Sequence, residues 1–150
     1  MSVEFRLALA GEPPLHEIAA VTAISPAERP TPKAGDTLLT ARLYDQRGYL
    51  LSVYSGTDGY YYAEGDNESP WEWELDTYVN VDFDMRTDGL VDKGIPNMVA
   101  TVGRVLAGRR EDAALVQDGN YLLLTRTAGV VRKHRQRQWW NHYGLDVPVG

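Results

Sequence analysis

Two aspartates with the spacing of a strand face are the residues of this chain that could most directly do acid–base or metal chemistry. Asp82 and Asp84 lie two positions apart in an alternating segment, so their carboxylates would project from one face of a strand. Such a pair could act as acid and base or bind a divalent cation. A hard cation needs more than two oxygen ligands, however, and the segment has no calcium-loop pattern. A solvated or ion-paired strand face is therefore the favoured interpretation.

The other residue types that carry catalysis do not fall into catalytic patterns. The three histidines, His16, His134 and His142, lack the spacing of a zinc-binding helix. The chain has no cysteine, which excludes disulfides, zinc–thiolate sites and cysteine nucleophiles. No serine lies in a G-x-S-x-G elbow, and no glycine-rich stretch matches a phosphate-binding loop. We therefore expect no metal, no cofactor and no covalent chemistry.

Acidic and aromatic residues gather in the middle of the chain. Residues 58–92 hold 11 acidic side chains against one basic side chain, Arg86, in a chain of net charge −6. Such a field repels nucleic acid and attracts basic surfaces, although a solvated sheet face would have the same composition. The run Tyr60–Tyr62 and the pair Trp71 and Trp73 lie in this region. They could form a protein-binding surface or fill the core beneath a hairpin.

Segment 132–137 is the basic counterpart of this region. It reads Arg-Lys-His-Arg-Gln-Arg and precedes Trp139 and Trp140, which superficially resembles an RNA-binding strip. The isoelectric point near 5.0 argues against a nucleic-acid binder. We expect an intramolecular contact with the acidic residues 64–92, or simple solvation.

Two similar successions of elements would position these residues. Each has an alternating strand (3–9 and 78–85), a helix (14–21 and 95–106) and a strand meander (38–63 and 113–131). Within the first meander, Ser55–Gly59 has the composition of a tight turn. Residues 25–36 form a mobile, proline-rich loop without an apolar face, and residues 136–143 form a last helix or a docked segment.

These elements predict a single α+β domain over residues 1–150, with halves at about 1–63 and 78–133 and a tail at 134–150. We expect a largely antiparallel, curved sheet with both helices packed on one face. The residues expected in its core are Phe5, Leu7, Leu43, Val81, Phe83, Met98, Val102 and Leu123. No apolar run approaches the roughly 20 residues that span a bilayer, and no signal peptide is evident. We therefore expect a cytoplasmic protein with no membrane partner.

A family resemblance rests on five segments: Leu43–Tyr49, Trp71–Glu74, Lys93–Val99, Leu106–Gly108 and Asp112–Gly119. They resemble the swarming-inhibition-toxin immunity family of bacteria, whose members are small cytoplasmic proteins that neutralise a cognate polymorphic toxin. The likeness is strongest over residues 78–131, and the loop 25–36 and the tail 132–150 have no counterpart in it. The resemblance implies a non-enzymatic protein with a protein toxin as its partner.

A toxin inhibitor needs a rigid, electrostatically complementary face rather than catalytic groups, and an acidic face would speed association with a basic toxin. Aromatic anchors coincide with dense acidic charge once, across residues 60–84. The predicted protein-binding residues are positions expected to alternate away from Trp71, Trp73, Val81 and Phe83: Tyr61, Glu64, Asp66, Glu72, Glu74, Asp82 and Asp84. Two alternatives stay open: a small enzyme or ligand-binding domain with a pocket between the sheet and its helices, and a housekeeping oligomer subunit.

Overall fold

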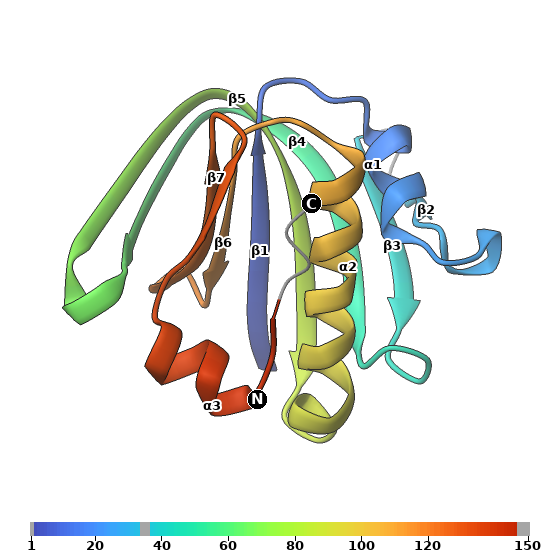
Figure 1. Ribbon diagram of the computed structural model, residues 1–150. Coiled ribbons are helices and arrows are strands. Elements are labelled where there is room, and N and C mark those ends of the chain that lie inside the picture. Colours follow the sequence, from blue (N-terminus) through green and yellow to red (C-terminus); the bar gives the residue numbers. More distant parts are fainter. Residues whose placement is uncertain (1, 34–36, 147–150) are drawn as a thin grey trace.

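The computed structural model describes residues 2–33 and 37–146, and Figure 1 shows the path of the chain. The strands are β1 (Ser2–Ala10), β2 (Thr31–Pro32), β3 (Leu38–Leu43), β4 (Tyr49–Glu64), β5 (Pro70–Arg86), β6 (Ala113–Gln117), β7 (Tyr121–Thr127) and β8 (Val130–Lys133). The helices are α1 (Leu15–Thr22), α2 (Ile95–Gly108) and α3 (Asn141–Tyr143). Short helical turns lie at Pro26–Glu28, Asp66–Glu68, Leu90–Gly94 and Gln136–Trp140.

The strands form one sheet in the order β2-β3-β4-β5-β1-β6-β7-β8, and neighbours in this order run antiparallel. β1 lies at the centre, where Phe5 pairs with Phe83 of β5 and with Gln117 of β6. Alternation on β1 buries Phe5 and Leu7 on one face and directs Arg6 to the other. The predicted α+β fold with a largely antiparallel curved sheet is confirmed.

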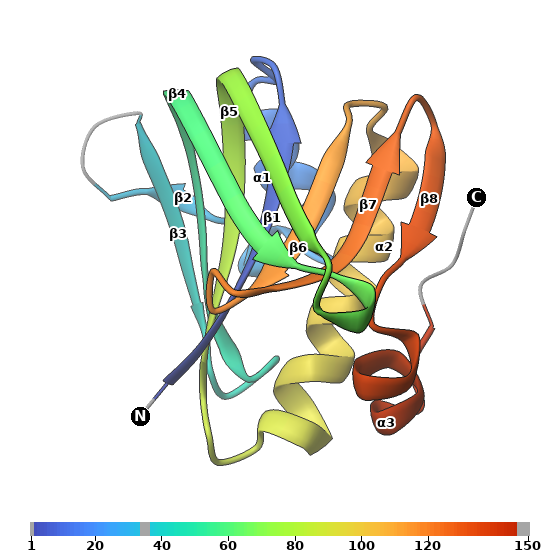
Figure 2. The same cartoon turned by 90° about the vertical axis from the view of Figure 1, so that its left-hand side faces the viewer.

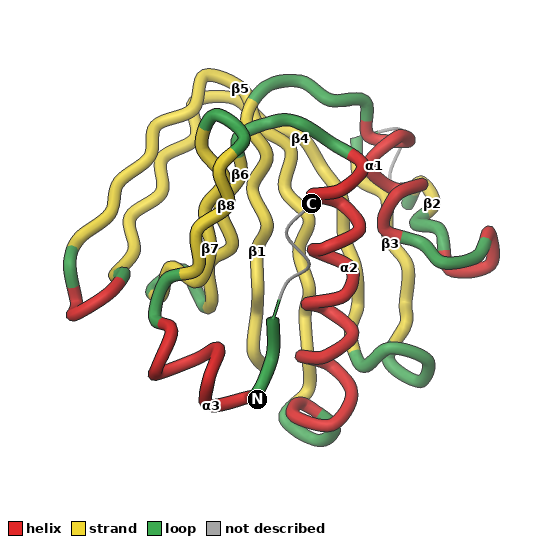
Figure 3. Tube along the Cα trace, viewed as in Figure 1, coloured by secondary structure: helices red, strands yellow, loops and turns green. Residues whose placement is uncertain are grey.

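Both α1 and α2 cover the same face of the sheet, as Figure 3 shows. In α2, Pro96 occupies the first turn, where its missing N–H is tolerated, and Met98, Val102 and Val105 form the buried stripe. Ile18 of α1 joins the same apolar cluster. Every residue expected in the core is buried: Phe5, Leu7, Leu43, Val81, Phe83, Met98, Val102 and Leu123. None of the helices in the described part of the chain has the length and apolar composition needed to cross a bilayer.

The hairpin of β4 and β5 is much longer than the sequence predicts. The turn expected at Ser55–Gly59 is wrong, because β4 runs through these residues and stays paired with β5. Gly56 and Gly59 have a different role: the Tyr78 ring lies across them, and a Cβ on Gly59 would stand 2.7 Å from Tyr78 Cδ2. These glycines make room for an aromatic ring on the strand rather than for a reversal. The chain reverses only at residues 65–69.

The distal half of this hairpin crosses the second face of the sheet, opposite the helices (Figure 2). There β4 meets β7: Glu64 pairs with Tyr121, and the Glu64 amide donates to the Asn120 carbonyl at 2.8 Å. A second apolar cluster fills the space beneath the tip of the hairpin. It consists of Ala63, Ala114, Val116 and Leu122, with Trp71 and Trp73 packed against them. The sheet thus closes on itself from β4 to β7.

The proline-rich loop and the C-terminal tail are both partly structured. Loop 25–36, which is expected to be mobile, contains a helical turn and the short strand β2. Residues 34–36 of this loop lie outside the described part. The tail docks against the sheet, which is one of the two forms predicted for it, a last helix or a docked segment. Trp139 and Trp140 are buried, and the Trp140 indole N–H donates to the Leu123 carbonyl at 2.8 Å. Residues 147–150 of the tail also lie outside the described part.

Candidate protein-binding site

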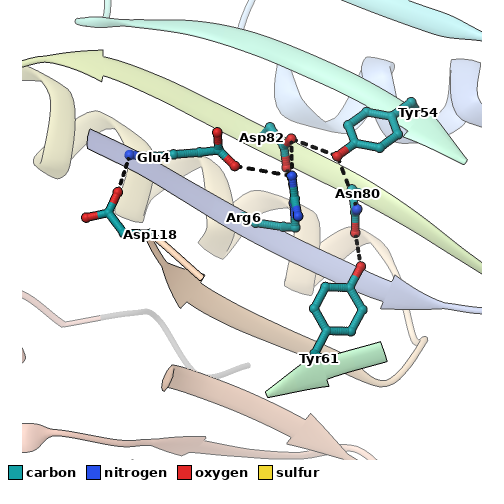
Figure 4. Close-up of polar contacts among 7 residues, drawn as sticks. All are labelled: Glu4, Arg6, Tyr54, Tyr61, Asn80, Asp82 and Asp118. Carbon is teal, nitrogen blue, oxygen red and sulfur yellow. Dashed lines mark hydrogen bonds and ion pairs between the residues drawn. The ribbon is translucent and has the colours of Figure 1, made fainter. Parts of the chain in front are cut away.

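A charged pair stands on the second face of the sheet, beneath the hairpin (Figure 4). Arg6 of β1 and Asp82 of β5 are direct neighbours across the two strands. The Arg6 guanidinium donates from Nε to Asp82 Oδ1 at 2.8 Å and from Nη2 to Asp82 Oδ2 at 3.0 Å. Such two-point pairs are the strongest geometry that arginine and a carboxylate can adopt. The ion-paired interpretation of Asp82 is therefore confirmed.

A chain of hydrogen bonds extends from this pair to the hairpin. Tyr54 donates to Asp82 Oδ2 at 2.9 Å, the Asn80 amide donates to the Tyr54 hydroxyl at 3.3 Å, and Tyr61 donates to Asn80 Oδ1 at 2.7 Å. Burial, and then the Asp82 charge, raise the pKa of Tyr54 to about 12, so its phenol keeps its proton. The chain fastens Tyr61, in the distal half of β4, to the centre of the sheet.

A groove of about 640 Å³ opens beside this network. Its lining comes from β1, from β4, from β6 and from the turn between β6 and β7: Ser2, Glu4, Arg6, Tyr60, Tyr61, Tyr62, Val116, Asp118 and Gly119. Burial raises the pKa of Glu4, and the neighbouring Asp82, Asp84 and Asp118 charges raise it further against the effect of Arg6. Glu4 therefore lies among other carboxylates as well as beside the Arg6 guanidinium.

The outer surface of the hairpin presents two exposed tyrosines between two glutamates. Tyr60 pairs with Glu74 and Tyr62 with Glu72 across β4 and β5, so the four side chains share one face. The tyrosines are 57% and 51% exposed, which is unusual for rings of this size in a packed strand. We call Tyr60, Tyr62, Glu72 and Glu74 the outer hairpin face. The alternate residues, including Ala63, Trp71 and Trp73, pack inward.

The seven predicted binding residues do not share one surface. Glu72 and Glu74 are exposed, whereas Glu64, Asp66 and Asp84 are only half-exposed. The placement of Tyr61 on the side away from the tryptophans is wrong, because its partner across the hairpin is Trp73 and the two rings are in contact. Asp82 is likewise engaged with Arg6, as described above. Within the run Tyr60–Tyr62, Tyr60 and Tyr62 are exposed, whereas Tyr61 packs beneath the hairpin as the core alternative expects for alternate residues.

The basic tail contacts the acidic region at Asp66. The Arg135 amide donates to Asp66 Oδ1 at 2.8 Å, and His134 Nδ1 lies 3.6 Å from Asp66 Oδ2. Burial lowers the pKa of His134, although the Asp66 charge raises it. Arg132 and Arg137 are exposed. The expected intramolecular contact between the tail and residues 64–92 is thus confirmed at Asp66.

Sequence reasoning missed several of the site's residues. Glu4, Arg6 and Asp118 lie far from residues 60–84 in the chain and reach the groove only through the sheet topology. The alternation of residues on β1 indicates that Glu4 and Arg6 point away from the core. The sequence around them does not indicate which other strand their side chains face. Asn80 is buried and polar, which on a strand signals a partner from another element.

A second cavity, also of about 640 Å³, lies between α1 and the Arg29–Pro32 segment. This is the place where the ligand-binding alternative expects its pocket. Leu15, Ala19 and Leu39 supply apolar walls, and the lining formed by the described residues contains no phenylalanine, tyrosine or tryptophan. Within residues 2–33 and 37–146, no group of three or more His, Asp or Glu side chains could hold a metal ion. Tyrosines and carboxylates occur together at the hairpin and not among the described residues that line this second cavity. This difference favours the hairpin as the place of protein binding.

Comparison with known proteins assigns the family. No curated protein and no solved structure matches the chain. A family model described as SitI3-like matches residues 3–144. The matched range spans loop 25–36 and extends into the tail as far as residue 144. The chain belongs to the SitI3-like family, a name that denotes immunity proteins of polymorphic toxin systems.

Proposed function

We propose that this protein is a cytoplasmic immunity protein that neutralises a cognate toxin by binding it at the outer hairpin face. The family supports the role of an immunity protein and a toxin as partner. The observation that carries the choice of surface is the pair of exposed tyrosines, each opposite a glutamate on a paired strand. Tyrosine is enriched among interface hot spots, and carboxylates steer and orient a basic partner.

The hairpin is held in place from below, which suits an inhibitor. Tyr61 is bonded to Asn80, and Trp71 and Trp73 pack on the second apolar cluster. A surface that is rigid before binding loses little conformational entropy when the complex forms. Tyr61 and Asp82 then act as positioning residues of the hairpin, and Glu72 and Glu74 contact the toxin. Glu64, Asp66 and Asp84 extend the negative field around this face.

The proposal requires that a reading frame next to this gene encode a toxin domain, and that domain is then the partner for the test. Co-expression of the two proteins should restore growth of a host that the toxin domain alone arrests. A Tyr60→Ala/Tyr62→Ala variant should protect poorly and bind the purified toxin domain at least about tenfold more weakly, since hot-spot tyrosines contribute 2 kcal/mol or more each. Circular dichroism and thermal unfolding establish that the variant is folded.

The matched control is Tyr44→Ala, which removes a half-exposed ring from the turn between β3 and β4. This turn lies at the end of β4 away from the hairpin tip, so its loss should leave protection intact. Wild-type affinity and full protection in the folded Tyr60→Ala/Tyr62→Ala variant would reject the outer hairpin face. Failure of the wild-type protein to bind or protect against the adjacent toxin would reject the proposed function itself.

A further inference from the structure

We propose that the groove beneath the hairpin receives an arginine side chain of the toxin. This inference rests on the proposed function and deepens it, because Tyr60 and Tyr62 belong both to the outer hairpin face and to the lining of the groove. A partner that covers the tyrosines from outside would therefore stand at the mouth of the groove. A side chain reaching inward from it would meet Glu4 and Asp118.

The groove has the size and the walls for such a side chain. Its volume of about 640 Å³ lies within the range of binding pockets and exceeds the space that one arginine needs. Tyr60, Tyr61 and Tyr62 of β4 line one side, where the Tyr61 ring is turned beneath the hairpin, and residues of β1, of β6 and of the turn after β6 line the other. An arginine can place its methylene stem and the flat face of its guanidinium against tyrosine rings while its N–H groups point to carboxylates.

The charge of the groove favours a cation. The Arg6 guanidinium pairs with two carboxylates, Glu4 and Asp82, and two more, Asp84 and Asp118, lie near Glu4. Arg6 directs two of its donors to Asp82 and a third to Glu4 Oε1 at 3.2 Å. Neutralisation by Arg6 is therefore incomplete, and an excess of negative charge remains at the mouth of the groove.

The contacts that these carboxylates make leave acceptors for an incoming donor. Glu4 uses Oε1 toward Arg6, and Asp118 uses Oδ1 to accept from the Glu4 amide at 2.9 Å. Among the residues that the structure describes, the second oxygens, Oε2 of Glu4 and Oδ2 of Asp118, take part in no hydrogen bond and can accept from a ligand. Two carboxylates flanked by rings match the planar five-donor fork of arginine better than the compact ammonium of lysine.

The first experiment uses L-arginine amide as the probe and needs no toxin. Titration of the ¹⁵N-labelled full chain should produce saturable shifts at the amides of residues 2–6, 60–62 and 116–119. The expected dissociation constant is on the order of 1 mM, given the size of the probe. L-citrulline amide, which has the same shape and no side-chain charge, should cause no saturable shift. Equal binding of the two probes, or shifts confined to other residues, would overturn the proposal.

Paired variants locate the interaction. Glu4→Gln keeps an acceptor for Arg6, and Asp118→Asn keeps the acceptor for the Glu4 amide and suits the positive φ of 51° at this position. The double variant should therefore fold and bind arginine amide at least about tenfold more weakly. Asp88→Asn/Asp92→Asn removes the same charge at exposed positions after β5, outside the groove lining, and should leave probe binding unchanged. The opposite ranking of the two variants would refute the assignment to the groove.

The toxin distinguishes this inference from the proposed function. If the protein is an immunity protein and the groove takes an arginine, Glu4→Gln/Asp118→Asn should weaken toxin binding about tenfold, whereas the wild-type protein binds and protects. Normal toxin binding by this variant would disprove the arginine contact and leave the immunity role standing. Arginine amide binding without any toxin binding would instead support the groove and reject the proposed function.

Discussion

Arg6 shows how a charged side chain is accommodated in the middle of a sheet. A half-buried guanidinium without a counter-charge would be strongly destabilising. Asp82 supplies the counter-charge at two points, and Tyr54 donates to the same carboxylate. Asn80 and Tyr61 continue the network, so the polar groups satisfy one another as a set. The network also links β1, the proximal part of the hairpin and its distal half through five side chains.

His134 carries a prediction about pH at the scale of a single residue. Burial lowers its pKa below the ordinary value of 6.5, so the unfolded chain takes up a proton more readily than the folded protein. Its contribution to the free energy of unfolding is therefore present above pH 6.5 and is lost as the pH falls through 6.5 and below. A His134→Gln variant, which can still bond to Thr125, should show a flatter pH dependence in urea unfolding between about pH 7.5 and 5.

An unchanged pH dependence in His134→Gln would mean that His134 titrates alike in the folded and unfolded states.

At the scale of elements, the bend of the hairpin depends on the glycines beneath Tyr78. A Gly59→Ala substitution should cost roughly 1–3 kcal/mol, because its Cβ would stand 2.7 Å from the Tyr78 ring, which must then move. In a Tyr78→Ala background the same substitution should be nearly neutral, since the remaining neighbour is Tyr61 Cε2 at 3.6 Å. Urea unfolding of the four proteins of this double-mutant cycle measures the coupling. Equal costs in both backgrounds would exclude the ring as the reason for the glycine.

The elements that sequence predicts well here are those with a strong local period. The alternation of Phe5, Leu7 and Leu9 and the stripe of α2 each determine which side is buried. The error at Ser55–Gly59 arose because glycine and aspartate are turn formers whose local pattern does not reveal a distant ring. Tyr78 lies 19 positions beyond Gly59, so only the pairing of β4 with β5 shows why glycine is needed there.

At the scale of the whole molecule, the site depends on how the sheet closes. The sequence predicts a dense acidic and aromatic region and its position in the chain, and the exposed Glu72 and Glu74 belong to it. It could not predict that the hairpin crosses the second face and meets β7, because this contact joins Glu64 to Tyr121. Because the hairpin meets β7, Tyr61 is turned toward the sheet, and Glu4 and Asp118 line the groove beside it.

Long-range electrostatics give the last prediction. The chain carries a net charge of −6, and the outer hairpin face contributes two exposed glutamates beside the tyrosines. Charges near a binding face raise the association rate with a basic partner, and salt screens this effect over about 10 Å at 0.1 M. Glu72→Lys/Glu74→Lys should leave stability within about 1 kcal/mol of wild type, because exposed strand charges contribute little to folding. It should slow association with the toxin at low salt and flatten the dependence of the rate on salt.

The control Asp88→Lys/Asp92→Lys changes the net charge equally at exposed positions after the opposite end of β5. Because these positions lie beyond the hairpin, the control should slow association much less than the hairpin variant. Stopped-flow association rates at several salt concentrations measure both. Equal slowing by the two variants would mean that net charge alone, and not the outer hairpin face, steers the toxin. Unchanged rates in the folded hairpin variant would reject this face as the docking surface, leaving the exposed basic residues of the tail as the next surface to test.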